Sequence, residues 1–400
     1  MSYPTPPTYT VNTAITPLDP TVTGSVRTYA IAPDLPPGLS LDATTGRISG
    51  TPTTPWRARH TVVATNSGGN TTFALTIAVV TERSTTDRTP DEASGLQVHV
   101  MYVIPSDGVD EQLDQTATLD QSLKIANEWF KSQTGGKGIR FDTYGGGKLD
   151  VTFLQLTKSD VEMNVSGGNV RTKLEYQLFA KGFDSPDKVY LVYYGGNGDG
   201  CGRGAWPPTL HGNVAAVYIG AASNCVNQPF AVATQPPGFL EFMGLHEILH
   251  VLGFAAPCAP NLTEGGHVGD SVQDLMYSGS QPWQPSTVDV NHDDYFGPMG
   301  TGCLDLANSA FLDPLPAGAE PPPKWPYATL TDLGCGGSAT PGTAGAPTQI
   351  MFVNSLSSAV QVYERVPSTT TPGTYQNSYR MDVPANDGAV LAVYQALPVT

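Results

Sequence analysis

The residues best placed to do chemistry are two histidines four positions apart, with a glutamate beside the first. His246 and His250 would project from one face of a helix, because four residues turn a helix by about 400°. Imidazoles at that spacing can reach one Zn²⁺, for which histidine nitrogen is a common ligand. Glu247 would lie beside the metal without binding it, where its carboxylate can take a proton from water. The spacing predicts a hydrolytic zinc centre; the alternative is a structural helix that carries two histidines.

The flanking sequence predicts that this segment is helical. Apolar residues recur at the three- and four-residue intervals of a buried helical stripe, at Phe242, Leu245, Leu249 and Leu252. Pro237 and Gly238 mark a start, and Gly253 suits the left-handed residue that ends many helices. We therefore expect both histidines and Glu247 on one regular helix.

The segment His246–Phe254 has the form HExxHxxGF and resembles the metzincin clan of zinc endopeptidases. In that clan a third histidine follows the glycine by three residues, but this position is Ala256, which cannot bind a metal. The leishmanolysin-like branch has the same form with an insertion before the third histidine. The resemblance implies that Ala255–Gly266 is the insertion and that His267 is the third zinc ligand.

The residues after His267 extend this resemblance. Asp274–Tyr277 is similar to the methionine-containing turn of metzincins, and Met276 follows His267 by nine residues. The resemblance implies that Met276 lies beneath the metal as an apolar floor and that Tyr277 forms part of the substrate pocket. Asp270 is the alternative third ligand, because carboxylate oxygen also binds zinc.

An acidic segment follows the predicted zinc region. Asp289, Asn291 and Asp293 alternate, and oxygen ligands at this spacing could hold Ca²⁺. The remaining ligands of a calcium loop are missing, so a solvated turn is the alternative. Tyr295, in the same segment, is a candidate hydrogen-bond donor to the oxyanion of a reacting carbonyl.

Length and composition bound the architecture and the partners. The 400 residues predict two or three domains, and the low share of charged residues (14%) with 43 Gly and 35 Pro favours strands and loops. The net charge of −16 argues against nucleic acid or an anionic membrane surface as a partner, because like charges repel. No apolar run reaches the roughly 18 residues that a membrane span needs.

The five cysteines lie between residues 201 and 335, and disulfides are typical of exported proteins. Cys201 with Cys225 is the expected local pair. Cys258 is expected to pair with Cys303 or Cys335 and so to pin the insertion. We therefore expect a secreted or cell-surface protein, whose export signal is not in this chain.

The first module is expected at residues 1–82 and is β-rich. Apolar and small polar residues alternate over Thr72–Val79, which predicts a half-buried strand that pairs with Thr61–Thr65. The segments Leu35–Asp42 and Thr45–Thr53 resemble the bacterial immunoglobulin-like domain family. The resemblance implies a small β-sandwich that serves as a spacer or in adhesion.

Two further modules follow a polar linker at residues 81–93. The central module, residues 94–335, is predicted to be an α+β domain in which a mixed sheet packs with two long helices, and this matches the metzincin resemblance. A strand is predicted at Val214–Gly220, before the active-site helix, and the metzincin resemblance implies that it is the edge strand that binds an extended peptide. Residues 348–400 are expected to form a small β-module with four short strands.

Together these features predict a multidomain, monomeric, secreted zinc endopeptidase. It would cleave a protein or glycoprotein through a metal-activated water, with Glu247 as general base. One alternative is a hydrolase with a glutamate as third ligand, but the glutamates after residue 254 follow no helical pattern. The other is a non-enzymatic cell-surface adhesin whose metal site is structural or vestigial.

Overall fold

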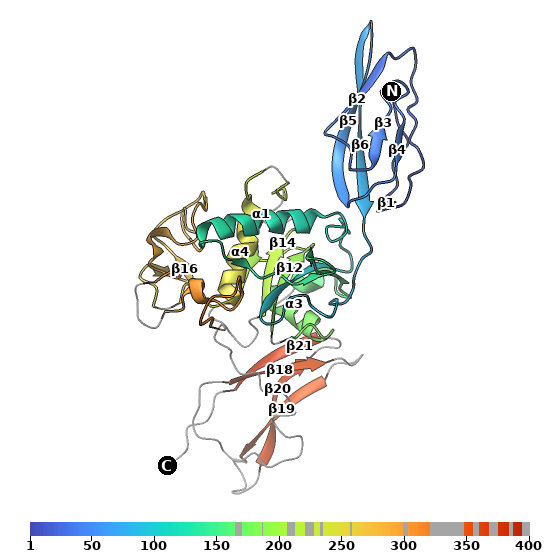
Figure 1. Cartoon of the computed structure of the whole chain (residues 1–400). Helices are drawn as coiled ribbons and strands as arrows, with labels where there is room; N and C mark the ends of the chain where they lie inside the picture. The colour runs from blue at the N-terminus through green and yellow to red at the C-terminus, as the bar shows by residue number, and fades with distance from the viewer. Residues whose placement is uncertain are drawn as a thin grey trace.

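A computed structural model of the chain has a β-rich N-terminal module, a mixed α/β central module and a set of C-terminal strands (Figure 1). It describes residues 1–164, 170–185, 187–205, 213–220, 228–232, 235–256, 258–298 and 303–320, and the backbone of four strands between 348 and 393. The helices in this described part all lack the combination of length and apolar character that crossing a bilayer requires.

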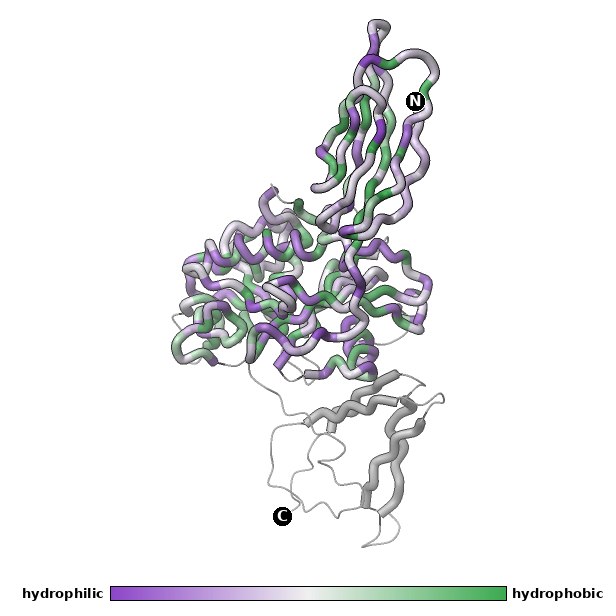
Figure 2. The backbone as a smooth tube through the Cα atoms, turned by 45° about the vertical axis from the view of Figure 1, so that its right-hand side comes forward, coloured by the Kyte–Doolittle hydropathy of each residue, from purple (hydrophilic) through white to green (hydrophobic). Residues whose placement is uncertain are grey.

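The N-terminal module is built around one long antiparallel hairpin. Its four-stranded sheet has the order β1-β6-β5-β2, and a separate hairpin joins β3 to β4. The strands are β1 (Tyr9–Thr10), β2 (Thr28–Ala32), β3 (Leu39–Leu41), β4 (Ile48–Gly50), β5 (Trp56–Asn66) and β6 (Gly69–Val80). Figure 2 shows apolar and polar residues alternating along these strands. The pairing of β5 with β6 confirms the predicted hairpin.

The central module contains a five-stranded sheet with the order β11-β7-β12-β14-β13. The first four strands run parallel and β13 runs antiparallel to β14. Their bounds are β7 (Gln97–Ile104), β11 (Val151–Gln155), β12 (Lys188–Tyr194), β13 (Gly202–Arg203) and β14 (Val214–Tyr218). Every residue of β7 and of β12 is buried, because helices cover both faces of the sheet.

Each face of this sheet has its own hydrophobic core. Side chains of α1 (Thr118–Gln133) and α4 (Phe239–Val251) pack with one face, and those of α2 (Asp160–Asn164) and α3 (Val170–Phe179) pack with the other. The two long helices of the prediction are thus α1 and α4, on the same face. Burial of α4 brings its histidines to the interior of the module.

The prediction that residues 214–220 form the edge strand is wrong. β14 lies between β12 and β13 and is buried at all five positions, as its apolar sequence VAAVY requires. The edge belongs to β13, a short Gly-Arg segment that precedes β14 in the chain and pairs with it antiparallel. The two residues of β13, Gly202 and Arg203, are too few and too polar to be predicted as a strand from the sequence. The longer apolar pattern of β14 was therefore predicted to be the edge strand.

The polar linker is bound to the central module by ion pairs. Arg83 reaches Asp110 at 2.6 Å and Asp114 at 2.7 Å. Arg88 pairs with the fully buried carboxylate of Asp150. The linker is polar because these charges meet partners on the central module, and it therefore holds a defined path instead of acting as a free tether.

The C-terminal strands are the four that the sequence predicts. They are β18 (Thr348–Asn354), β19 (Val360–Pro367), β20 (Tyr375–Val383) and β21 (Asp387–Val393), paired as β18 with β21 and β19 with β20. The remaining short elements are β8 (Gly138–Ile139), β9 (Thr143–Tyr144), β10 (Lys148–Leu149), β15 (Leu262–Thr263), β16 (His267–Val268), β17 (Leu312–Asp313), η1 (Val290–His292) and η2 (Leu306–Asn308).

Candidate metal centre

The helix α4 presents His246, Glu247 and His250 to the interior, and all three are buried. Its start is held by Glu241, whose Oε2 accepts the Gly238 N–H at 2.9 Å. Its end is Gly253 with φ +84°, the left-handed residue that the sequence predicts. The chain leaves the helix there and returns to the same site at β16.

Three imidazoles converge at this site. The Nε2 atom of His250 lies 3.0 Å from His246 Nε2 and 3.2 Å from His267 Nε2. Ligands bound to zinc at 2.0–2.1 Å in a tetrahedral arrangement are about 3.3 Å apart. The spacing of the three nitrogens is therefore close to that of a zinc site with three histidines.

The hydrogen bonds of the Nδ1 atoms assign the tautomers of His246 and His267. His246 Nδ1 donates to the Leu275 carbonyl oxygen at 2.7 Å, and His267 Nδ1 donates to that of Glu264 at 2.9 Å. With Nδ1 protonated, each Nε2 of these neutral rings carries a lone pair. Burial, and then the neighbouring His267, lower the pKa of His246 to about 3. Burial also lowers the pKa of His250 and of His267, so all three rings are neutral at pH 7.

Neutral rings whose lone pairs face one another repel unless a cation lies between them. The residues therefore fit a zinc ion on the chemistry of their donors as well as on their spacing. The carbonyl oxygens of Leu275 and Glu264 are the outer partners that such rings commonly have.

Glu247 lies beside the imidazoles with one oxygen unused. The side chain is buried, and among the described residues its Oε2 has no hydrogen-bond partner. Burial raises the pKa of Glu247 to about 8. A Cβ atom on Gly202 would lie 2.5 Å from Glu247 Oε1, and one on Gly204 would lie 2.5 Å from His250 Cβ. Glycine at these two positions lets the edge strand approach the site closely.

Asp270, the alternative third ligand, is not part of this site. It is exposed, and its carboxylate groups with those of Asp293 and Asp294. His267 belongs to the two-residue strand β16 that faces the helix, whereas Asp270 lies beyond its end. The structure therefore brings His267, and not Asp270, to the two helical histidines.

The predicted turn lies against the site. Met276 is fully buried, and its carbonyl oxygen accepts the Val268 N–H at 2.9 Å, next to His267. Tyr277 is half-buried, and its hydroxyl lies 3.3 Å from Ser280 Oγ. The turn thus supports both α4 and β16.

Trp283 is a site residue that the sequence analysis missed. Its ring centroid lies 5.5 Å from that of His246 and 5.5 Å from that of Phe239. Its Nε1–H donates to the Asp274 carbonyl oxygen at 3.0 Å. The only signal was an aromatic residue soon after Met276, in a segment without periodicity, so only the fold identifies it.

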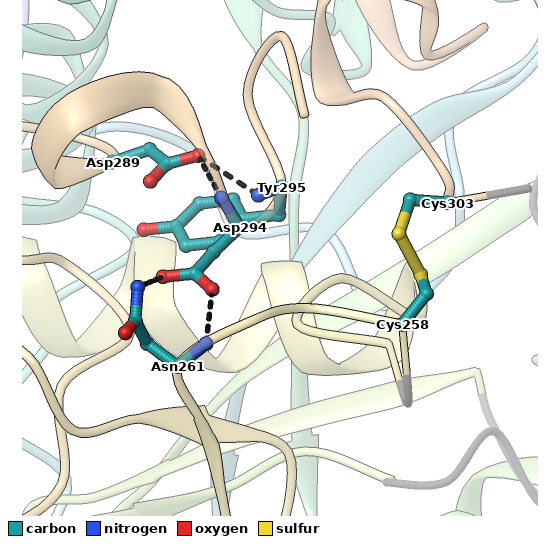
Figure 3. The surroundings of a disulfide bond; sticks show 6 residues. All are labelled: Cys258, Asn261, Asp289, Asp294, Tyr295 and Cys303. Carbon is teal, nitrogen blue, oxygen red and sulfur yellow. Dashed lines mark hydrogen bonds between the residues drawn. A yellow bond between two sulfur atoms is a disulfide. The ribbon is translucent and has the colours of Figure 1, made fainter. Parts of the chain in front are cut away.

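The predicted calcium trio of Asp289, Asn291 and Asp293 does not form. The Oδ2 atom of Asp289 accepts the backbone N–H groups of Asp294 and Tyr295 at 3.3 and 2.8 Å (Figure 3). It also accepts that of Phe296 at 2.6 Å. Asn291 is exposed in a left-handed conformation, and Asp293 groups with Asp270 and Asp294 instead. The alternation of Asp289, Asn291 and Asp293 in the sequence predicted that their side chains lie on one face of an extended segment, but the chain turns within this segment.

Tyr295 does not face the site. It is fully buried, and its hydroxyl donates to Asp274 Oδ1 at 2.7 Å. The expectation that it donates to an oxyanion is therefore wrong, because its one proton is already engaged beneath the turn.

The insertion is pinned at two points (Figure 3). Cys258 forms a disulfide with Cys303, one of its two predicted partners. Asn261 donates to the carboxylate of Asp294 from its backbone N–H at 2.9 Å and from its side-chain amide at 3.1 Å. Cys201 is also disulfide-bonded, whereas Cys225 and Cys335 lie outside the described residues.

Comparison with known families identifies the N-terminal module. Residues 2–81 match the family described as "Putative Ig domain". This agrees with the predicted resemblance and with the β-rich sheet of residues 9–80, so the first module is an Ig-like domain.

Comparison with curated proteins found no match. Among solved structures, the titin domains z1z2 in complex with telethonin align at 16% identity over 27% of this chain and 57% of that chain, with a TM-score of 0.17. Two putative alpha-galactosidases from Bacteroides fragilis NCTC 9343 align at 15% and 14% identity over 47% of this chain, and over 36% and 51% of theirs, with TM-scores of 0.16. Such low scores support no inference about fold or activity.

Proposed function

We propose that the chain is a zinc-dependent endopeptidase of the metzincin type. The observation that carries the proposal is the convergence of three neutral imidazoles beside the buried carboxyl of Glu247, whose Oε2 has no partner among the residues that the structure describes. A purely structural zinc site has no use for such an acid. The mixed sheet with two long helices and the buried turn at Met276 agree with the metzincin resemblance of the sequence.

The chain supplies the ligands and the base of this reaction. A zinc ion held by His246, His250 and His267 would lower the pKa of water and polarise the substrate carbonyl. Glu247 would accept the proton of the attacking water on Oε2. Burial raises the pKa of this carboxyl to about 8 in the metal-free protein, and the charge of a bound zinc ion would lower that pKa and keep the carboxylate available as the base. Glu247 then passes this proton to the departing amine, so that the carboxylate is restored and the peptide C–N bond is broken.

The edge strand β13 is the proposed binding site for the substrate backbone. Gly202 and Arg203 form the outer strand of the sheet, and an extended peptide can pair with such an edge by adding a further strand. The close approach of Gly202 and Gly204 to Glu247 and His250 would place the scissile bond beside the base. A protein or glycoprotein substrate suits this mode of binding.

Disulfides and the Ig-like module support a secreted or cell-surface location. The same module favours a second candidate function, a non-enzymatic adhesin with a structural metal. The endopeptidase requires the carboxylate of Glu247 for its activity. An adhesin does not, since it needs no proton acceptor beside its metal.

The substitution Glu247→Gln tests the proposal. The amide keeps an oxygen for the Gly204 N–H but cannot accept the proton, so hydrolysis of casein should fall by at least about 100-fold. Zinc content, measured by elemental analysis, should stay equal to that of the wild type, and a chelator should abolish wild-type cleavage. Undiminished cleavage by the variant would rule out the endopeptidase mechanism, and zinc binding without any wild-type cleavage would favour the adhesin.

A further inference from the structure

The turn that contains Met276 contacts the imidazole of His246 and the backbone next to His267. The carbonyl oxygen of Leu275 accepts the His246 Nδ1–H at 2.7 Å. The carbonyl oxygen of Met276 accepts the Val268 N–H at 2.9 Å, and Val268 is the neighbour of His267 in β16. A change in the conformation of this turn would therefore move both rings relative to His250.

The carboxylate of Asp274 holds the turn in place. Its Oδ1 accepts the Met276 N–H at 2.7 Å and its Oδ2 accepts the Val290 N–H at 2.8 Å. The hydroxyl of Tyr295 donates to the same Oδ1 at 2.7 Å. Asp274 and Tyr295 are both 0% exposed, so water cannot replace a bond that is lost.

Tyr295 is fixed by its own backbone. The Oδ2 atom of Asp289 accepts the N–H group of Tyr295 at 2.8 Å (Figure 3) and that of Phe296 at 2.6 Å. Asp289 is also buried, so the loop that carries Tyr295 has little freedom to follow a displaced turn. A continuous set of hydrogen bonds thus leads from this loop through Tyr295 and Asp274 to the acceptor of His246.

We propose that Asp274 and Tyr295 are positioning residues of the metal centre, which act on His246 through the carbonyl group of Leu275. The inference rests on the proposed zinc site. Its physical basis is that a ligand imidazole needs a fixed acceptor at its second nitrogen, both to keep the tautomer and to aim the lone pair. Loss of such an outer partner commonly weakens metal binding about 10- to 100-fold.

Tyr295→Phe is the most direct test, because it removes one hydroxyl and almost no volume. The dissociation constant for zinc, measured by competition with a chelator well below the unfolding temperature, should rise about 10-fold while the stoichiometry stays unchanged. Tyr190→Phe is the matched control. Tyr190 is 1% exposed, and its hydroxyl accepts the Ser185 N–H at 3.0 Å in the core on the other face of the sheet. This control should lose stability and keep the zinc affinity of the wild type.

Substitutions of Asp274 provide the conservative comparison. In Asp274→Asn the amide oxygen can still accept the Met276 N–H, whereas in Asp274→Leu no acceptor remains. Zinc affinity should therefore decrease from wild type to Asn to Leu. Adding Tyr295→Phe to Asp274→Leu should have little further effect, because the hydroxyl no longer has its partner. If the Leu variant does not fold, Tyr295→Phe and Asp274→Asn still decide the question.

The outcomes separate this inference from the proposed function. A weakened zinc affinity in Tyr295→Phe but not in Tyr190→Phe supports the positioning role. Equal affinity in Tyr295→Phe and wild type overturns that role and leaves the metal centre intact. Failure of the wild type to bind zinc overturns the metal centre and the positioning role together.

Discussion

Two of the imidazoles lie on a regular helix, and the third lies on a segment with almost no regular structure. In α4, hydrogen bonds between nearby backbone groups set the relative positions of His246 and His250. The segment 258–298 has only the short elements β15, β16 and η1 between its turns. Side chains and a disulfide hold it in place, among them Cys258–Cys303 and Asn261 with Asp294.

The difference shows that the proposed metal centre depends on one helical segment and on one irregular segment, which are stabilised in different ways. A helix is stabilised by hydrogen bonds between nearby backbone groups and by the burial of its apolar face. Ordering an irregular backbone costs about 1–2 kcal/mol per residue, and the segment has to offset this through contacts between distant residues. Substitutions that remove these contacts should weaken the zinc site and leave α4 intact.

The largest loss is expected when Cys258 and Cys303 are both replaced by serine. Closing a loop of this sequence separation (45 residues) contributes about 2–4 kcal/mol to the free energy of unfolding. Urea denaturation should show that loss, and chelator competition should show weaker zinc binding, because His267 lies in the released segment. Unchanged zinc affinity would mean that the insertion is held without its disulfide.

The next prediction concerns Glu247 on α4 and the pH dependence of the free energy of unfolding. Burial raises the pKa of Glu247 from 4.5 to about 8, so between these pH values the native metal-free protein binds a proton that the unfolded chain does not. The contribution of this proton to the free energy of unfolding is fully present below pH 4.5 and is lost as the pH rises to 8. The free energy of unfolding changes by at most about 1.4 kcal/mol per pH unit for this reason.

Glu247→Gln should remove this part of the pH dependence. The measurement is the free energy of unfolding of metal-free wild type and variant at several pH values from 5 to 8. Parallel curves for the two proteins would show that Glu247 does not titrate in this range.

The smallest effect is expected for Asn261→Ala. It removes the side-chain hydrogen bond to Asp294 at 3.1 Å and should cost about 1 kcal/mol. Asn127→Ala is the matched control on α1, where the side chain bonds both backbone groups of Ile139 at 3.0 and 2.7 Å. Thermal unfolding should detect both losses, but only Asn261→Ala should weaken zinc binding. Equal zinc affinities would show that this anchor does not position His267.

The elements that the sequence predicts well have short-range patterns. The apolar stripe around Leu245 and Leu249 predicts the helix, and Gly253 ends it with a positive φ. The alternation over Thr72–Val79 predicts the long hairpin of the Ig-like module for the same reason. In each case residues within about four positions determine both the conformation and the buried face.

The errors have a common physical origin. The place of a strand in a sheet depends on distant partners, so the apolar pattern of β14 could not show that β13 lies outside it. The alternating oxygens near Asp289 were expected to share a face, but hydrogen bonds to the Asp289 carboxylate turn the chain there. The ring of Trp283 reaches His246 across 37 positions of sequence, and no local pattern reports such a contact.

By itself, the sequence determined the helix that carries His246, Glu247 and His250, because helix geometry and burial follow from residues one turn apart. It also determined the candidates His267 and Asp270, since both donor types bind zinc. Only the tertiary structure brought His267, and not Asp270, to the two helical histidines and placed Tyr295 against Asp274 of the turn. The physical reason is that an irregular segment takes its conformation from contacts with distant residues, and these exist only once the chain has folded.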